Sequence, residues 1–317
     1  MTAREEQRMH SPVVLGLDFG GTKIAVAVCE MTGARLGSAT VQTLAERGAR
    51  ASLDRGIRAA RTLLATAAPG RPLAAVGVAT FGIPGEDGVA LAPTVPGWSD
   101  LALGRELREA FPGARISMGT DVKAAAAAEV AWGALAGVDP GIYLNLGTGL
   151  AVAIVAGGTV LYGRHGASGE IGYNLRSRGD VGLSLSDRTP LEDAVSGVAL
   201  LRQASAVLPR ATGAVDVFER APDDPRMARL LDDFVAELSF HLVNLAVAVD
   251  PQRIVVGGGM ARSWDRMHAS LRGALDAAVP FPPELVLAEF PFDAPLMGAL
   301  ALGTAAARDA LNEGAVA

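Results

Sequence analysis

The chain has 317 residues, of which 50% are hydrophobic and 20% charged, a balance typical of a folded globular protein. This length favours two lobes over one core. The formal net charge of −6 excludes a global basic field that would attract nucleic acid or a membrane surface, so we expect neither as a partner.

Residues 1–11 are polar and charged and lack the apolar segment of a signal peptide, so we expect a flexible tail. No apolar stretch is long and uniform enough to span a bilayer. The single cysteine, Cys29, excludes an intrachain disulfide and suits a reducing cytoplasm, where it would serve as a small packing residue.

Two short apolar runs, Val13–Leu17 and Ile24–Val28, predict buried strands joined by a tight turn. The turn contains Asp18, Gly20, Gly21, Thr22 and Lys23. Its glycines would leave backbone N–H groups free for an anionic phosphate, and Lys23 adds a positive charge. Asp18 suits such a site if a cation such as Mg²⁺ lies between the carboxylate and the phosphate. An ordinary hairpin turn is the alternative, since Asp and Gly are common in turns.

Strands and helices are expected to alternate along the rest of the chain. Strands are predicted at residues 34–41, 73–80, 116–119, 142–154 (as a second hairpin) and 253–256. Helices are predicted at residues 50–68, 101–111, 121–132, 191–208, 230–249 and 294–311. Residues 163–192 are polar and irregular. This alternation indicates an α/β fold with largely parallel strand pairing.

The second hairpin repeats the pattern of the first. Asp18-Phe19-Gly20 aligns with Asn145-Leu146-Gly147, and small apolar strands follow in both cases. We therefore predict a second phosphate loop, formed by Gly147, Thr148 and Gly149. Gly257, Gly258 and Gly259 close a strand and open a helix, where N–H groups and the helix dipole favour an anion. A tight strand-to-helix turn would explain these three glycines almost as well.

Asp121 is the strongest catalytic candidate, because it follows a strand and opens a helix, where loops deliver side chains to a cleft. Capping that helix is the alternative role, and the two are compatible.

The Asp-Phe-Gly-Gly-Thr-Lys turn resembles the first phosphate loop of the actin/hexokinase superfamily, and within it the chain is similar to the ROK family of bacterial sugar kinases and repressors. The most specific segment, residues 166–173, reads Gly-Ala-Ser-Gly-Glu-Ile-Gly-Tyr and resembles the family's Gly-Ala-x-Gly-Glu-Ile-Gly-His. The resemblance implies a two-lobed actin-like ATPase (ribonuclease H-like) fold with the active site in the interlobe cleft. It also implies ATP with Mg²⁺, a cytoplasmic enzyme and a homodimer.

Residue roles carry over from the resemblance by position. Asp121 matches the general base that accepts the proton of the attacking sugar hydroxyl, and Gly257–Gly259 matches the adenosine segment. Glu170 and Glu192 match glutamates that hydrogen-bond sugar hydroxyls, although either could be an ordinary surface residue. The residues expected to bind the sugar are Gly82, Thr94, Thr120, Asp121, Glu170, Tyr173 and Glu192.

The chain departs from the family pattern near the sugar. Where the family has a zinc-binding histidine and three cysteines, this chain has Tyr173, Leu183, Leu185 and Pro190. None is a good zinc ligand, so we expect no structural zinc, with apolar packing of the two leucines holding the loop. Thr94 and Thr120 each replace an asparagine of the family pattern.

We therefore expect a small lobe of residues 12–121 and 294–317 and a large lobe of residues 122–293. The predicted function is ATP-dependent phosphorylation of a hexose hydroxyl, at C6 of glucose or of a modified hexose such as kanosamine. A sugar-sensing ROK repressor is the alternative, disfavoured by the dozen residues before Val13 and by the negative charge. A non-catalytic sugar-binding protein is disfavoured by the presence of Asp18, Lys23 and Asp121.

Overall fold

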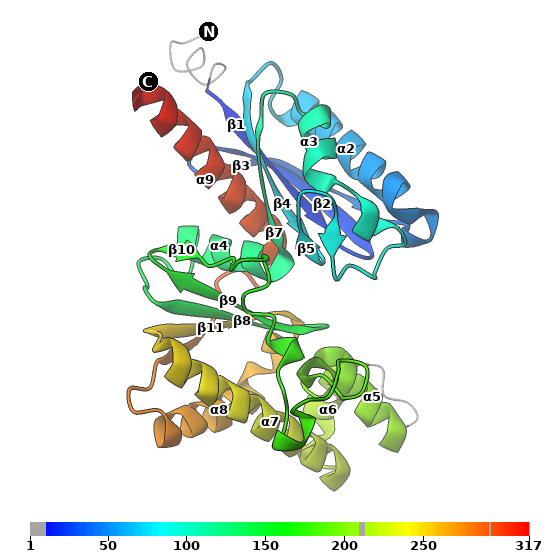
Figure 1. Cartoon of the computed structure of the whole chain (residues 1–317), viewed down its shortest axis with the longest axis vertical. Coiled ribbons are helices and arrows are strands. Elements are labelled where there is room, and N and C mark those ends of the chain that lie inside the picture. Colours follow the sequence, from blue (N-terminus) through cyan, green and yellow to red (C-terminus); the bar gives the residue numbers. More distant parts are fainter. Residues whose placement is uncertain (1–10, 209–212, 292, 317) are drawn as a thin grey trace. The chain divides into compact units, whose positions relative to one another are not determined.

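The computed structural model describes residues 11–208, 213–291 and 293–316 (Figure 1). They form two compact units. Of the described residues, unit 1 holds those up to Ala131, the segment Tyr162–Ala167 and those from Asp293 onward. Unit 2 holds Trp132–Leu161 and the described residues from 168 to 291. Of the predicted tail, only Ser11 is described, and its carbonyl accepts a hydrogen bond from Arg71 Nε at 2.9 Å.

Unit 1 contains a five-stranded mixed sheet in the order β3-β2-β1-β4-β7. Its elements are β1 (Val13–Phe19), β2 (Lys23–Glu30), β3 (Arg35–Gln42), α2 (Gly48–Ala67), β4 (Leu73–Thr80), β5 (Ile83–Pro84), β6 (Val89–Ala90), α3 (Leu103–Ala110), β7 (Arg115–Thr120), α4 (Asp121–Trp132) and α9 (Ala294–Val316), with short 3-10 turns at Ala45–Arg47 and Trp98–Asp100. The pairs β1–β2 and β2–β3 are antiparallel, and β1–β4 and β4–β7 are parallel.

Helices cover both faces of this sheet (Figure 1). Alternate strand residues such as Leu15 and Val26 pack with Leu53 of α2 and Leu107 of α3 in one apolar cluster. The opposite face meets α9 at backbone distance, because a Cβ added at Gly77 would overlap the carbonyl oxygen of α9 residue Ala299. Small residues therefore set how closely α9 can lie on β4.

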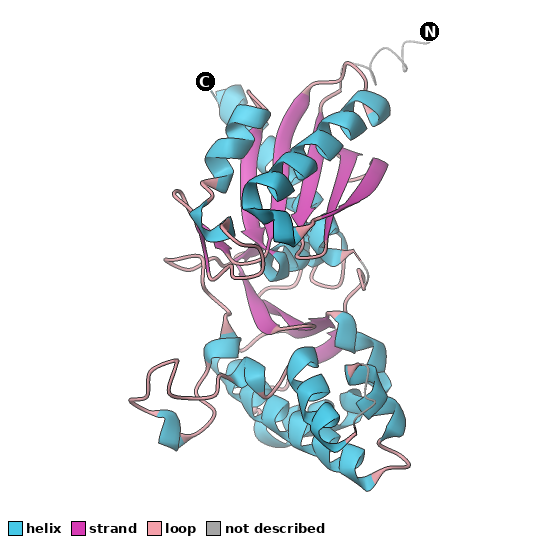
Figure 2. Ribbon diagram, turned by 90° about the vertical axis from the view of Figure 1, so that its right-hand side faces the viewer, coloured by secondary structure: helices cyan, strands magenta, loops and turns pink. Residues whose placement is uncertain are grey.

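Unit 2 contains a second five-stranded sheet, whose order β10-β9-β8-β11-β12 corresponds strand by strand to that of the unit 1 sheet. Its elements are β8 (Gly141–Leu146), β9 (Leu150–Ala156), β10 (Thr159–Val160), α5 (Gly197–Val207), α6 (Ala214–Arg220), α7 (Pro225–Val249), β11 (Arg253–Gly257), α8 (Trp264–Ala278) and β12 (Glu284–Leu287), with 3-10 turns η3 (Ile171–Tyr173), η4 (Arg178–Asp180), η5 (Leu191–Asp193) and η6 (Gly259–Ser263). Side chains of β8, β9 and β11 pack with those of α5 to α8 in one core cluster. In Figure 2 the helices of this unit (cyan) lie against its sheet (magenta).

The prediction of largely parallel pairing is wrong in part. Both sheets are mixed, with two antiparallel and two parallel strand pairs each. The reason is the hairpins: strands joined by three-residue turns, as β1–β2 and β8–β9 are, must run antiparallel. The likeness between the two hairpins thus extends to whole sheets.

Two further expectations need correction. The helix predicted at residues 191–208 is a 3-10 turn, η5, followed by α5, which begins at Gly197 because Ser196 Oγ caps it by accepting the Ala199 N–H at 3.1 Å. The predicted apolar packing of Leu183 and Leu185 is wrong, since their side chains are 47% and 54% exposed.

Within the described part of the chain, no helix is both long and apolar enough to cross a membrane.

Candidate active site

The β1–β2 turn is held by its own backbone. The Gly20 N–H donates to the Lys23 carbonyl at 3.0 Å, and Thr43 Oγ1 donates to the Gly20 carbonyl at 2.6 Å. The expectation that all N–H groups of this turn are free is therefore wrong for Gly20. The N–H groups of Gly21 and Thr22 donate to no group within the described residues, which leaves two donors for an anion.

Thr94 lies against this turn, where a Cβ added at Gly21 would come within 2.5 Å of Thr94 Cγ2. Its segment is anchored by Trp98, which is fully buried and donates from Nε1 to Thr80 Oγ1 at 3.1 Å. The Trp98 ring also packs on Phe19, with the ring centroids 5.2 Å apart. The exposed Thr94 is thus held next to the first phosphate loop by a buried aromatic anchor.

Asp18 and Asp121 form the acidic part of the candidate site in unit 1. Burial and the negative charge of Asp121 raise the pKa of Asp18 to about 7, while Lys23 acts in the opposite direction. Asp121 is exposed at the start of α4, and its Oδ1 accepts the Val122 N–H at 2.9 Å. Because the half-buried Asp18 lies near a second carboxylate, that of Asp121, the site favours a bound cation. This agrees with the role predicted for Asp18 from the sequence.

A metal here would need ligands beyond the protein. Within the described part of the chain, no group of three or more His, Cys, Asp or Glu side chains could hold a metal ion. Mg²⁺ usually takes one or two carboxylates and completes its coordination with phosphate oxygens and water. The donor set of Asp18 and its neighbour therefore fits a cation brought with a nucleotide.

Two residues expected to touch the sugar have structural duties in unit 1. Thr120 is only 5% exposed, and its Oγ1 accepts the Lys123 N–H at 3.2 Å, which caps α4. Gly82 has φ of +76°, and a Cβ there would lie 2.6 Å from that of Ala92. The sugar contacts of Thr120 and Gly82 stay predictions.

The β8–β9 turn in unit 2 is held by two flanking segments. The Gly147 carbonyl accepts the N–H of Gly197, the first residue of α5, at 2.8 Å. Glu192 Oε2 accepts the Leu150 N–H at 2.8 Å. Thr148 is exposed at the tip, and its N–H donates to no group within the described residues.

Beside this turn lies a cavity of about 270 Å³. Its lining residues are Gly147, Thr148, Gly197, Val198, Leu201, Ala214, Val215, Phe218, Gly259, Met260 and Ser263. The cavity brings two of the predicted nucleotide segments together and adds an apolar wall from α5 and α6. Sequence reasoning missed this wall, although the apolar residues Val215, Val217 and Phe218 give α6 an amphipathic pattern.

The three glycines after β11 differ in duty. A Cβ at Gly257 would overlap the Tyr143 side chain. Gly258 has φ of +91°, and a Cβ there would lie 2.4 Å from the Leu146 carbonyl oxygen. These two are required by close packing of β11 on β8. Gly259 alone lines the cavity, and it opens the 3-10 turn η6 rather than an α-helix.

The predicted sugar-reading residues of unit 2 lie together. Burial and the charges of Glu170 and Glu192 raise the pKa of Tyr173, which places all three near one another. A Cβ at Gly172 would lie 3.2 Å from Glu192 Cβ, so η3 and η5 are in contact. Tyr173 is 40% exposed and Glu170 is half-buried.

The two sheets have the same strand order, and in each a hairpin with a glycine-containing turn comes before the strands that pair in parallel. This duplicated arrangement defines an actin-like ATPase fold. A solved structure described as a ROK hexokinase from Thermus thermophilus has this fold with a TM-score of 0.78, is 30% identical, and covers 95% of this chain and 100% of its own. The chain belongs to the ROK family, whose profile matches residues 14–306.

Two curated relatives extend the comparison. A kanosamine kinase from Amycolatopsis mediterranei is 32% identical over 276 residues, which cover 84% of this chain and 87% of that protein. A glucokinase from Thermotoga maritima is 27% identical, over 82% of this chain and 86% of that protein.

Proposed function

We propose that this chain is an ATP-dependent sugar kinase, which transfers the γ-phosphoryl group of ATP to a hydroxyl group of a hexose. The observation that carries the proposal is the unit 2 cavity, where an apolar wall meets the β8–β9 turn and Gly259. An apolar slot beside free N–H groups suits a nucleoside attached to phosphates. Membership of the ROK family, with relatives named as kanosamine kinase and glucokinase, supports the sugar as acceptor.

Each unit offers donor groups for a nucleotide. In unit 1 the donors are the N–H groups of Gly21 and Thr22 and the ammonium of Lys23. In unit 2 they are Thr148, Gly149 and the start of η6. Asp18 would hold Mg²⁺, which would neutralise charge on the phosphates. Burial raises the pKa of the Asp18 carboxyl to about 7, and its ionised form is the one that would hold Mg²⁺.

Proton removal falls to Asp121 in this proposal. Its carboxylate is exposed at the start of α4, with Oδ1 accepting the Val122 N–H, and it would accept the proton of the attacking hydroxyl. Most of the barrier would be lowered by orientation of the reactants and by charge stabilisation. Glu170 and Glu192 would each accept hydrogen bonds from sugar hydroxyls, with Tyr173 beside them.

For the substrate, we propose the C6 hydroxyl of glucose or of an amino-hexose such as kanosamine. Support comes from Tyr173, whose phenol can donate to or accept from a ring substituent, and from the relative named kanosamine kinase. A cytoplasmic location and a homodimer belong to the same proposal. Light scattering that gives the mass of one chain would remove the homodimer from it.

The experiment is an ADP-release assay with the purified full chain, ATP and Mg²⁺ across hexoses, amino-hexoses and N-acetylated hexoses. We expect sugar-dependent ADP release with at least one of them, with a 6-phosphate as product by mass spectrometry and NMR. Asp121→Asn is the matched control, because it keeps the side-chain shape and the oxygen that accepts the Val122 N–H. Sugar binding by calorimetry without ADP release from any sugar would refute the kinase and favour a binding protein or regulator.

A further inference from the structure

The segment between η3 and η5, residues 174–190, carries few apolar contacts of its own. In Figure 1 it is part of the green chain beside α7. Residues 181–187 are all exposed, including Leu183 and Leu185. Arg188 is half-buried, although residues 187 and 189 on either side of it are exposed. Burial of apolar surface therefore cannot be what orders this segment, and polar contacts must do so.

Arg188 joins the two ends of the segment. Its Nη2 donates to the Tyr173 carbonyl at 2.6 Å, and its Nη1 donates to the Asn174 carbonyl at 3.0 Å. The guanidinium is a rigid planar fork, so two bonds to consecutive carbonyls fix its position and theirs together. Fourteen residues are enclosed in this way between the last residue of η3 and Arg188.

Other polar contacts hold the first half of the segment. Arg176 Nε donates to Glu237 Oε1 of α7 at 2.8 Å. Asp180 Oδ2 accepts the N–H groups of Arg176 at 2.8 Å and Ser177 at 2.9 Å. These contacts tie the segment to α7 and form a local turn. They do not bring its second half back to Tyr173, which is what the Arg188 fork does.

We propose that Arg188 is a positioning residue of the sugar site. Arg188 lies four residues before Glu192, and by holding the Tyr173 and Asn174 carbonyls it fixes the end of η3 beside η5. It thereby sets Tyr173 and Glu170 against Glu192. Its effect on the sugar rests on the proposed function, whereas its closure of the segment does not. The same contact explains why this loop keeps its place without buried leucines.

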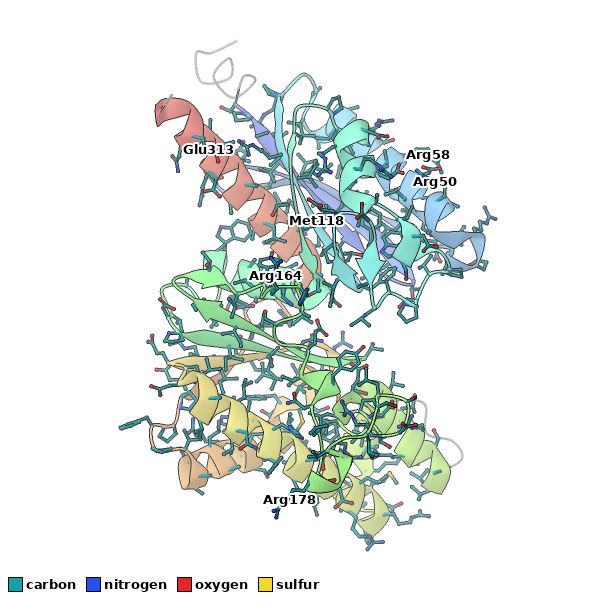
Figure 3. All side chains as sticks on the ribbon, in the orientation of Figure 1. Arg50, Arg58, Met118, Arg164, Arg178 and Glu313 are labelled. Atoms are coloured by element: carbon teal, nitrogen blue, oxygen red, sulfur yellow. The ribbon has the colours of Figure 1, made fainter. Side chains whose placement is uncertain are left out.

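Three variants test the proposal: Arg188→Ala, Arg188→Lys and the control Arg178→Ala. Arg178 lies in the same segment, is exposed, and its side chain has no hydrogen bond or ion pair within the described residues (Figure 3). Lysine can replace one of the two bonds but not the fork, so Arg188→Lys should be intermediate.

The first measurement is amide hydrogen exchange of the full chain without ligands. We expect residues 174–187 to exchange about ten-fold faster or more in Arg188→Ala, with the β-strands of unit 2 unchanged and Arg178→Ala like wild type. The second is steady-state kinetics with the sugar that gives most ADP release. We expect the sugar KM to rise about ten-fold in Arg188→Ala, the ATP KM to stay within two-fold, and Lys to restore part of the loss.

The outcomes separate the two proposals. Faster exchange with unchanged sugar KM overturns the positioning role and leaves Arg188 as a structural clamp. Unchanged exchange in Arg188→Ala overturns the closure itself. An equal rise in sugar KM and ATP KM would show general damage to unit 2 and would also overturn positioning. Wild type that phosphorylates no sugar refutes the proposed function and the sugar role with it, while hydrogen exchange still decides whether Arg188 closes the segment.

Discussion

Replacing Glu192 separates two roles that its carboxylate combines. Oε2 accepts the N–H of Leu150, a residue only 2% exposed, at 2.8 Å. Glu192→Ala would leave that N–H without its partner, which costs about 1–3 kcal/mol of unfolding free energy when no replacement is found. Because Glu192 is itself exposed, water can enter the vacated space, so we expect about 1–2 kcal/mol. Glu192→Gln keeps an acceptor oxygen and should cost less than about 1 kcal/mol.

In catalysis, the glutamine variant should be impaired even though its stability is nearly unchanged. Glutamine retains the loop contact but replaces a hydroxyl acceptor with a donor, so its sugar kcat/KM should fall by about 1–3 kcal/mol, or roughly five- to 150-fold. Thermal unfolding checks stability, where each kcal/mol corresponds to about 2–4 °C for a domain of this size. Asp193→Ala is the control, since its contact with Arg202 is exposed and long at 3.6 Å. Equal melting temperatures for the Ala and Gln variants would refute the role in holding the loop.

Three further predictions follow from the unit 1 site. Asp121→Ala should lower kcat by about 10²-fold or more with the circular dichroism spectrum unchanged, and near-normal turnover would exclude it as the base. Since the pKa of Asp18 is raised from 3.8 to about 7, its contribution to stability is full below about pH 4 and lost as pH rises through 7. An asparagine at this position cannot ionise, so Asp18→Asn should melt at a higher temperature than ligand-free wild type at pH 8 but not at pH 4. A gain in melting temperature that does not depend on pH would contradict the raised pKa. Activity should require added Mg²⁺, while chelation should not lower the melting temperature, and one tightly held zinc per chain by elemental analysis would overturn this.

Elements with a continuous apolar signal were predictable from the sequence. The strand at residues 73–80 and the helix at residues 121–132 coincide with β4 and α4. The strand β12 was missed because it has only four residues directly after two prolines. The division of residues 191–208 was missed because the apolar spacing continues through Ser196, and only the geometry shows its hydroxyl capping α5.

The candidate site was predictable as a set of residues and less so as a set of duties. The positions of Asp18, Asp121 and Glu170 follow from strand ends and a specific motif. The sequence does not show, however, whether a glycine exposes its N–H group to a ligand or provides space for a neighbouring side chain. Gly257 provides space for Tyr143. In the same way, a threonine at the end of a strand can face a ligand or cap a helix, as Thr120 does. Such duties depend on contacts distant in sequence.

The seating of α9 on the unit 1 sheet has a consequence for how the protein is made. Gly77 of β4 and Ala299 of α9 are more than 200 residues apart in the chain, yet their backbones are in direct contact. Most of unit 2 lies between them in sequence. During synthesis, therefore, the ribosome releases all of unit 2 before α9 can cover the second face of the first sheet. The sheet that is made first therefore has one apolar face without its covering helix until α9 has been synthesised.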